Sequence, residues 1–507
     1  MIVNLYFLIN VPKTQWLFTV WMIFVAIYLI IDIFTIIHIL KNKHHEPVSA
    51  LLWIFIIVEL NYIGLIMYLF LGINRINTKG VKVSEAHKAM HAMRILPGSL
   101  SAYLKKIRAF HYSGNNIKEH TYLSILDRLQ ASTYPILGNK IELLEDGTCA
   151  YPKMFDAIKN AKYHIHLQSY IIMNDEVGKK LFDLLELKAK SGVKIKVLFD
   201  RMGSAKAYKA HFFKHWAKNI PNLEIKPFSV FNLFAPYRIQ LRNHRKLLII
   251  DGKIAFIGGI NISADNDRRI NKNKYIHDLH CRIEGPVIGE FQYTFLRDWC
   301  FVSKVDPIKI LETKYQYFRT PVHCGDSIIR INSSGPGQSF EASEKLFMTG
   351  VTAAKDSVWI ITPYFVPDKS FIDLLRMAAA RNVDVKIIIP QNNNHWYVRY
   401  AATSFYNVLL KDNIRIYEKK GVFSHVKAML IDGEWATMGS SNCDNRSFRL
   451  NYELDFSVEG GEFIRDLHDQ FIKEISESVE ITMVDRLNRS TKEELLEAFC
   501  SLLTPVL

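Results

Sequence analysis

The sequence predicts an α/β protein with a two-helix membrane hairpin at the N-terminus and two duplicated α/β domains that share one active site. Three observations support this fold class. Two long apolar stretches lie near the N-terminus. Further along, short aliphatic runs alternate with helix-like segments, and the alternation begins twice. A polar motif in the first series then recurs in the second, 181 residues later, from His244 to His425.

The N-terminal part, 1–75, is predicted to anchor the chain in a membrane. Asp32 is the only fully charged residue in 17–40, and Glu59 is the only one in 48–72. Each stretch is longer than the ~20 residues that a helix needs to cross a bilayer. A cleaved signal peptide is the alternative, but it would have a shorter apolar core and a small-residue cleavage site, which does not follow Leu40.

Charge predicts the orientation and the partner. A basic connector, 76–130, follows the anchor, and the basic residues after the second apolar stretch are Arg75, Lys79, Lys82, Lys88 and Arg94. The loop between the stretches has only Lys41 and Lys43, so the positive-inside rule places the C-terminal part in the cytoplasm. The net charge of +14 indicates an anionic partner, and the apolar helices favour a membrane surface over nucleic acid.

The six cysteines form no paired motif, which is typical of free thiols.

Two α/β domains are expected at 131–305 and 306–507. Strand, helix and strand patterns occur twice, with strands at 164–172, 193–200, 246–259, 358–366, 383–390 and 427–440, and helices at 182–190 and 371–382. The repeat is too long for a solenoid and indicates domain duplication.

The repeated motif reads H-x-K-x4-D-x6-G-[GS]-x-N. Its members are His244, Lys246, Asp251, Gly258, Gly259 and Asn261 in the first copy, and His425, Lys427, Asp432, Gly439, Ser440 and Asn442 in the second. On a strand, residues i and i+2 share a face, so each histidine and lysine point the same way. Two such strand ends would form a site rich in hydrogen-bond donors and positive charge, which suits a phosphate group.

Two imidazoles on opposite sides of a phosphorus supply a mechanism. One attacks the phosphorus to form a phosphohistidine, and the other donates a proton to the leaving alcohol and later deprotonates the incoming one. The asparagines, Gly259 and Ser440 are candidates for binding the phosphate. Asp251 and Asp432 belong to the candidate catalytic set, although each precedes a glycine and is at least as well explained by a turn. A zinc site of His244, His277 and His280 is disfavoured by the neighbouring lysines, so no metal is expected.

These residues resemble the phospholipase D superfamily with its paired HKD motifs, and within it the bacterial cardiolipin synthases. The likeness covers most of the chain and includes 138–158, 169–178, 361–375 and 442–453. It implies two phospholipase-D-like domains that face one site and use no metal or cofactor. It also implies that two phosphatidylglycerol molecules are converted to cardiolipin and glycerol.

The resemblance also assigns roles. His244 would be the nucleophile and His425 the acid/base, although the symmetry of the sequence does not separate them. In the family a carboxylate downstream of each motif orients its histidine, and the matching residues are Asp278 and Glu453. The chain departs from the family pattern at Ile276-His277, at Gly337 and at Asn394, which leaves the donor and acceptor preference open.

Three functional hypotheses follow. The first is a phosphatidyltransferase that makes cardiolipin in a bacterial cell membrane, with its catalytic domains on the cytoplasmic side. The second is a membrane phospholipase D, or a transferase with another acceptor, because water and an alcohol require the same base. The third is a lipid-binding scaffold without activity, which complete motifs argue against. The aromatic residues Tyr364, Phe365, Trp396 and Tyr397 could line a route for lipid, although such residues more often lie in a core.

Overall fold

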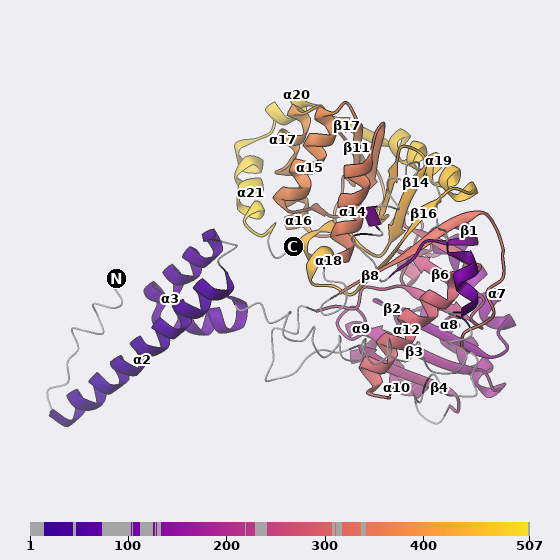
Figure 1. Ribbon diagram of the computed structural model, residues 1–507, viewed down its shortest axis with the longest axis horizontal. Coiled ribbons are helices and arrows are strands. Elements are labelled where there is room, and N and C mark those ends of the chain that lie inside the picture. The colour runs from indigo at the N-terminus through magenta and orange to yellow at the C-terminus, as the bar shows by residue number, and fades with distance from the viewer. Residues whose placement is uncertain are drawn as a thin grey trace. The chain divides into compact units, whose positions relative to one another are not determined.

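The computed structural model describes residues 15–43, 47–72, 103, 105–111, 125–126, 128, 133–217, 220–228, 241–306, 310, 317–335 and 341–504. The chain divides into two compact units, one around the N-terminal helices and one that contains both halves of the repeat (Figure 1). Arg75 and most of the predicted connector, including the basic residues from Lys79 to Arg94, lie outside the described residues. Gly337 does as well.

The N-terminal unit is a pair of helices, α2 (Gln15–Asn42) and α3 (Pro47–Met67), and a short π-helical turn, η1 (Tyr68–Gly72), continues α3. Both helices are long and apolar enough to cross a bilayer. Most of their large apolar side chains are exposed, as expected for surfaces that face lipid. The backbone of α3 bends at Asn61, whose φ is 47°, and its side chain accepts a hydrogen bond from the Tyr28 hydroxyl at 3.2 Å.

The catalytic unit contains the two halves of the repeat. A 3₁₀ turn, η3 (Arg108–Phe110), precedes them. The first half comprises β1 (Ile136–Glu145), α7 (Asp146–Asn160), β2 (His164–Ser169), α8 (Glu176–Lys190), β3 (Lys194–Asp200), α9 (Ala205–Lys209), α10 (Phe212–Ala217), β4 (Leu223–Phe228), β5 (Leu247–Ile250), β6 (Ile254–Gly258), η5 (Ala264–Asn266), α11 (Arg268–Asn271), β7 (Leu279–Glu284) and α12 (Ile288–Ser303).

The second half begins with β8 (Ser327–Ser334). It continues with α14 (Ala342–Ala353), β9 (Ser357–Ile361), β10 (Phe365–Val366), α15 (Lys369–Ala380), β11 (Asp384–Pro390), α16 (Trp396–Thr403), α17 (Tyr406–Lys411), β12 (Arg415–Lys419), β13 (Ala428–Ile431), β14 (Trp435–Gly439), β15 (Cys443–Asp444), α18 (Asn445–Arg449), β16 (Glu453–Glu459), α19 (Glu462–Ser476), β17 (Ser478–Ile481), α20 (Met483–Leu487) and α21 (Thr491–Ser501).

Fifteen strands of the described chain form one mixed sheet that runs through both halves. The order is β17-β12-β11-β9-β13-β14-β16-β8-β1-β7-β6-β5-β2-β3-β4. Outward from the antiparallel β1–β8 pair at the centre, each strand of one half has its counterpart at the same distance in the other. The additional strand β17 extends the second half. The duplication in sequence is therefore a duplication in topology.

Alternation along the central strands divides the core into layers. Leu247 and Ile249 of β5 face a core that both halves share, and helices α12 and α19 cover this core. Leu248 and Ile250 face the opposite side of the sheet, where α7 and α8 pack. Strand β13 alternates in the same way. Because both faces of these strands are buried, they appear in the sequence as continuous aliphatic runs.

The predicted α/β class is correct, with one difference in detail. The runs 246–259 and 427–440 are each a hairpin of two strands, β5–β6 and β13–β14, and not single strands. The turns contain Asp251-Gly252 and Asp432-Gly433, and all four residues have positive φ. The Lys253 N–H donates to the Ile250 carbonyl at 2.9 Å, which closes a type I′ turn.

Candidate functional site

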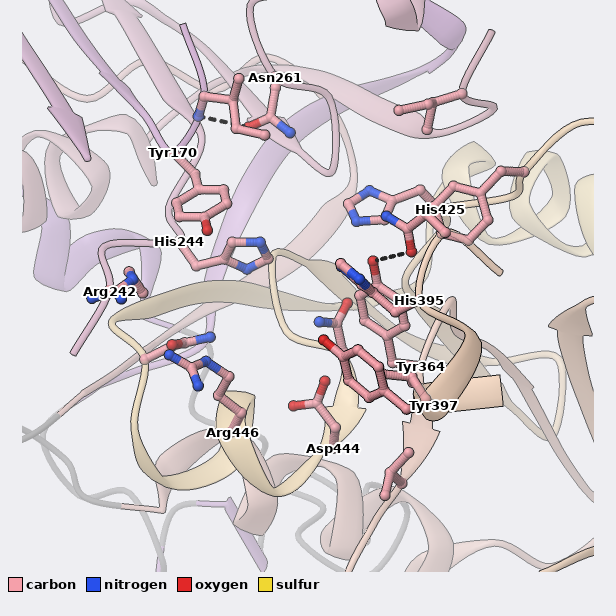
Figure 2. Close-up of a pocket in the computed structure, with 18 of the residues that line it drawn as sticks. Tyr170, Arg242, His244, Asn261, Tyr364, His395, Tyr397, His425, Asp444 and Arg446 are labelled. Atoms are coloured by element: carbon pink, nitrogen blue, oxygen red, sulfur yellow. Dashed lines mark hydrogen bonds between the residues drawn. The ribbon is translucent and has the colours of Figure 1, made fainter. Parts of the chain in front are cut away.

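A cavity of about 500 Å³ lies in the catalytic unit and receives side chains from both halves. His244, which precedes β5, and His425, which precedes β13, both line it (Figure 2). The two imidazoles project into the opening from different halves. Asn261 and Asn442, the last residues of the two motif copies, also line this cavity. The structure therefore brings four of the motif residues together around one space.

The two histidine segments are held by backbone pairing across the halves. The His244 N–H donates to the Tyr452 carbonyl at 2.9 Å, and Tyr452 N–H donates to the Arg242 carbonyl at 2.8 Å. In the same way, the His425 N–H donates to the His277 carbonyl at 2.7 Å. Tyr452 and His277 immediately precede Glu453 and Asp278. Each carboxylate is therefore delivered to the histidine of the opposite half.

This crossed arrangement corrects the expected pairing. The sequence interpretation assigned to each histidine the carboxylate downstream in its own half, which is wrong. Nδ1 of His244 lies 3.1 and 3.0 Å from the two carboxylate oxygens of Glu453. Nδ1 of His425 lies 2.7 Å from Oδ2 of Asp278. When Nδ1 donates to a carboxylate, the neutral ring keeps its lone pair on Nε2, the nitrogen available for chemistry.

Burial sets the protonation of these groups. It lowers the pKa of His425 to about 3, with a further lowering by the ammonium of Lys427. Burial also lowers the pKa of His244, although Glu453 opposes the shift. For Asp278, burial would raise the pKa, but Lys427 and His425 outweigh it and hold the pKa below its ordinary value. The lowered pKa values favour the neutral form of both imidazoles near pH 7, and a phosphodiester anion beside them would favour protonation of one.

The motif lysines are buried beside the main chain of their own histidines and are not among the residues that line the cavity. The Lys246 ammonium donates to the His244 carbonyl at 2.7 Å, and the Lys427 ammonium donates to the His425 carbonyl. Burial lowers the pKa of Lys246 to about 7 and that of Lys427 to about 8. A phosphate anion in the cavity would raise both pKa values and so favour the charged ammonium form of the two lysines.

Gly259 and Ser440, the predicted phosphate ligands beside the asparagines, do not line the cavity. A Cβ on Gly259 would lie 2.1 Å from Oδ1 of Asp278, so the glycine provides space for the carboxylate. The Ser440 hydroxyl donates to Oε2 of Glu453, and the Ser440 carbonyl lies 3.0 Å from Nδ1 of His244. Gly259 and Ser440 therefore support the carboxylates of Asp278 and Glu453. The geometry favours this role over the predicted direct binding of phosphate.

Asp251 and Asp432 lie at the other end of their strands. Six residues, including the four of the strand, separate each aspartate from its histidine, a distance of roughly 23 Å for extended chain at ~3.3 Å per residue. The carboxylate of Asp251 accepts the N–H groups of 162–164 at 2.7 to 2.9 Å. Asp432 accepts those of 355–357. Both therefore fix the entry to a neighbouring strand, and this geometry favours the turn role over direct chemistry for the two aspartates.

The alternative zinc set is not assembled. His277 uses both ring nitrogens on carboxylates, with Nδ1 2.8 Å from Asp146 and Nε2 2.7 Å from Glu474. Among the described residues, the one compact set of possible metal ligands is Glu145, Asp146 and His277. His277 takes part there as an ion-pair partner, since the carboxylates overcome the effect of burial and raise its pKa to about 10.

Several lining residues were not singled out by the sequence analysis. Tyr170 is one of them and lies edge-on to His244 with ring centroids 4.8 Å apart, as Tyr364, already considered for a lipid route, lies edge-on to His425 at 6.1 Å. Others among them are Arg242, His395, Phe423, Asp444 and Arg446. Of the aromatic residues considered for a lipid route, Tyr364 and Tyr397 line the cavity, Phe365 is core, and Trp396 is 59% exposed. Arg446 lies within 442–453, a stretch already notable in the sequence.

The comparisons with known proteins agree with this geometry. The model of the family described as cardiolipin synthase, phospholipase-D-like domain, matches residues 154–299 and 348–475, and a phospholipase D-nuclease N-terminal model matches 30–72. A cardiolipin synthase of Listeria monocytogenes serotype 4a (strain HCC23) is 30% identical over 483 residues, covering 95% of this chain and 98% of that protein. A probable cardiolipin synthase of Bacillus subtilis (strain 168) is 30% identical, covering 92% and 90%.

A solved structure extends the likeness of fold. Phosphatidylserine synthase of Haemophilus influenzae Rd KW20 superposes with a TM-score of 0.58 at 14% identity, over 76% of this chain and all of that one. The two matched segments of the family model contain the two histidine motifs, and the relatives extend across both units of the chain. The chain therefore belongs to the bacterial cardiolipin synthases of the phospholipase D superfamily, phosphatidyltransferases that act on membrane phospholipids.

Proposed function

We propose that the chain joins two phosphatidylglycerol molecules into cardiolipin and releases glycerol through a phosphatidyl-histidine intermediate. The observation that carries the proposal is the convergence of His244 and His425 on one cavity, each with a buried carboxylate at Nδ1. Nε2 of one imidazole attacks the donor phosphorus as the bond to glycerol breaks. The other imidazole protonates the departing glycerol oxygen.

The second half of the reaction uses the same groups in reverse. The imidazole that gave up its proton removes one from a hydroxyl of the second phosphatidylglycerol. The resulting oxygen attacks phosphorus, and the P–N bond to the enzyme breaks. Following the assignment usual in the family, His244 is the nucleophile and His425 the acid/base. Lys246 and Lys427 supply positive charge from behind the histidines, and Asn261 and Asn442, which line the cavity, supply donors to the phosphate.

The test is a product analysis with purified full-length protein in mixed micelles that contain phosphatidylglycerol. Cardiolipin and glycerol should form in equal amounts, and His244→Ala and His425→Ala should each lower the rate by several orders of magnitude, because the two groups act as a unit. Acid-quenched protein should carry labelled phosphatidyl groups on a histidine. Phosphatidic acid as the main product would support the hydrolase hypothesis, and turnover by the double variant would contradict the proposed mechanism.

We further propose that α2 and α3 both cross the membrane and that the catalytic unit lies on the cytoplasmic side. The proposal rests on the apolar lengths of the two helices and on the excess of Lys and Arg after the second one. A fluorescent protein that matures only in the cytoplasm, fused after Leu507, should be bright. A periplasm-dependent phosphatase at the same position should be inactive, and the opposite result would invert the orientation.

A further inference from the structure

The cavity is symmetric at its centre and asymmetric at its sides. The repeat relates His244 to His425 and Asn261 to Asn442 by the same offset in sequence. The same offset places Phe423 opposite Arg242 and Asp265 opposite Arg446. Both arginines line the cavity, whereas Asp265 does not. Arg242 and Arg446 therefore have no basic residue at the equivalent position of the other half, and they make the cavity asymmetric in charge.

The two arginines converge from different halves. Arg242 precedes His244 by two residues, and Arg446 lies in α18 just after Asn442. Figure 2 shows both side chains on the side of the cavity where Tyr170 and His244 lie. Burial lowers the pKa of Arg242, and the positive charge of Arg446 lowers it further, against the opposing charge of Asp200. Both arginines also act on the pKa of Tyr170, which burial raises.

The opposite side of the cavity is aromatic. Phe423, Tyr364 and His395 surround His425 there, with Phe423 and His425 ring centroids 5.8 Å apart. Among the described residues that line the cavity, Asp444 is the one carboxylate, and its side chain accepts the Ser447 N–H at 2.6 Å. The two guanidinium groups line the other side, where His244 lies, and the positive charge of Arg446 opposes that of Arg242. A bidentate anion placed there would relieve the repulsion between the arginines.

We propose that Arg242 and Arg446 form a subsite for a second phosphodiester, the one carried by the phosphatidylglycerol whose hydroxyl attacks the phosphatidyl-enzyme. The inference rests on the proposed function. The acceptor carries its phosphate three carbons from the attacking hydroxyl, so both phosphates of the nascent cardiolipin must fit in one cavity. Neither water nor free glycerol can use this subsite. The arginines therefore select the lipid acceptor, and the histidines alone perform the chemistry.

Two reactions of the full-length protein separate these roles. In cardiolipin synthesis the acceptor brings a second phosphate. In the exchange of labelled glycerol into phosphatidylglycerol, both the leaving group and the acceptor are free glycerol, so only the reaction centre is used. Arg242→Gln and Arg446→Gln should each lower cardiolipin synthesis by roughly 10- to 100-fold, mainly through the KM for phosphatidylglycerol, as expected for loss of a hydrogen-bonded charge pair. Glycerol exchange should stay within about threefold.

Matched variants complete the design. Arg415→Gln removes the same charge from β12, where Arg415 pairs with Asp384 at 2.6 Å outside the cavity, and it should leave both reactions unchanged. Arg242→Lys and Arg446→Lys keep the charge without the planar fork and should give intermediate values. A parallel fall of both reactions in the Gln variants, or a fall in neither, would overturn the subsite. Wild-type protein that exchanges glycerol but makes no cardiolipin would instead refute the proposed function.

Discussion

At the scale of single residues, the crossed pairs give the two histidines separate supports. Asp278 contacts His425, and Glu453 contacts His244. A substitution of one carboxylate therefore acts directly on one histidine. The carboxylate holds the ring orientation and stabilises the imidazolium that forms during proton transfer. Loss of either charge should therefore affect the step that its own histidine performs.

This leads to a prediction with a phosphatidyl donor whose leaving group is 4-nitrophenolate, which departs without a proton. Asp278→Asn should keep the rapid burst of nitrophenolate. Its steady-state turnover should be roughly 100-fold slower than that of wild type, because only the second step needs His425 as a base. Glu453→Gln should slow the burst itself. Stopped-flow absorbance measures both phases.

Peptide mapping of the trapped label provides an independent control. Label on His244 in the Asp278→Asn protein would agree with the assigned roles. If Glu453→Gln gives the burst and Asp278→Asn does not, the roles of the two histidines are the reverse of those proposed. Equal slowing of both phases in both variants would mean that the carboxylates act on the site as a whole.

At the scale of elements, the two hairpins β5–β6 and β13–β14 separate chemistry from stability. The histidine lies before the first strand of each hairpin, and the aspartate of the motif lies in its turn. Each aspartate has positive φ and binds three backbone N–H groups of a neighbouring strand. The conventional motif thus joins a reaction centre at one end of a strand to a structural clamp at the other.

We accordingly expect Asp251→Asn and Asp432→Asn to destabilise the fold by about 1–3 kcal/mol each, because an amide oxygen replaces a charged acceptor of three backbone hydrogen bonds. Thermal unfolding should begin several degrees lower, whereas kcat at low temperature should change little. Asp373→Asn, at a surface ion pair with Arg376 on α15, is the control and should change little in either measurement. Loss of turnover with an unchanged unfolding midpoint would return these aspartates to the catalytic set.

The sequence could predict those parts of the site that depend on local periodicity. His244 and Lys246 share a strand face because side chains alternate, and the repetition at His425 indicates a paired site. The crossed carboxylates could not be predicted, since Asp278 follows His244 in the chain and only the pairing of His277 with 424–425 moves it to the other half. The Asp-Gly pairs were a hairpin signal within what was interpreted as single strands. Arg242 and Arg446 lie far apart in sequence, so only the folded chain brings them together.

At the scale of the whole molecule, the two halves are joined by the β1–β8 pair and by a buried ion cluster. His277 contributes to that cluster from the first half, between Asp146 of its own half and Glu474 of α19. Lys419 of β12 also binds Glu474 at 2.8 Å, and a partly exposed pair, Glu145 with Lys473 at 2.5 Å, lies beside the buried cluster. The same His277 provides the carbonyl that binds the His425 N–H. The junction between the halves and the reaction centre therefore share a residue.

The cluster predicts how stability depends on pH. Burial alone would lower the pKa of His277, but its bonds to Asp146 and Glu474 raise it to about 10, above the ~6.5 of an unfolded histidine. A pKa that is higher in the folded state means that folding favours the protonated form. The contribution of His277 is thus fully present below about pH 6.5, declines as the pH rises, and is lost above about pH 10.

His277→Gln should therefore lower the unfolding midpoint of the detergent-solubilised protein most at pH 6, less at pH 8 and least near pH 10. Lys419, Lys473 and Tyr275 also titrate near His277, but they are present in both proteins. The difference between the two unfolding midpoints therefore reports mainly on His277. His468→Gln, which removes a half-exposed imidazole stacked on Trp359, controls for the loss of a histidine elsewhere on α19. A gap between wild type and His277→Gln that stays constant from pH 6 to pH 10 would mean that His277 is neutral in the folded chain. The junction would then depend on packing and hydrogen bonds, without the buried positive charge.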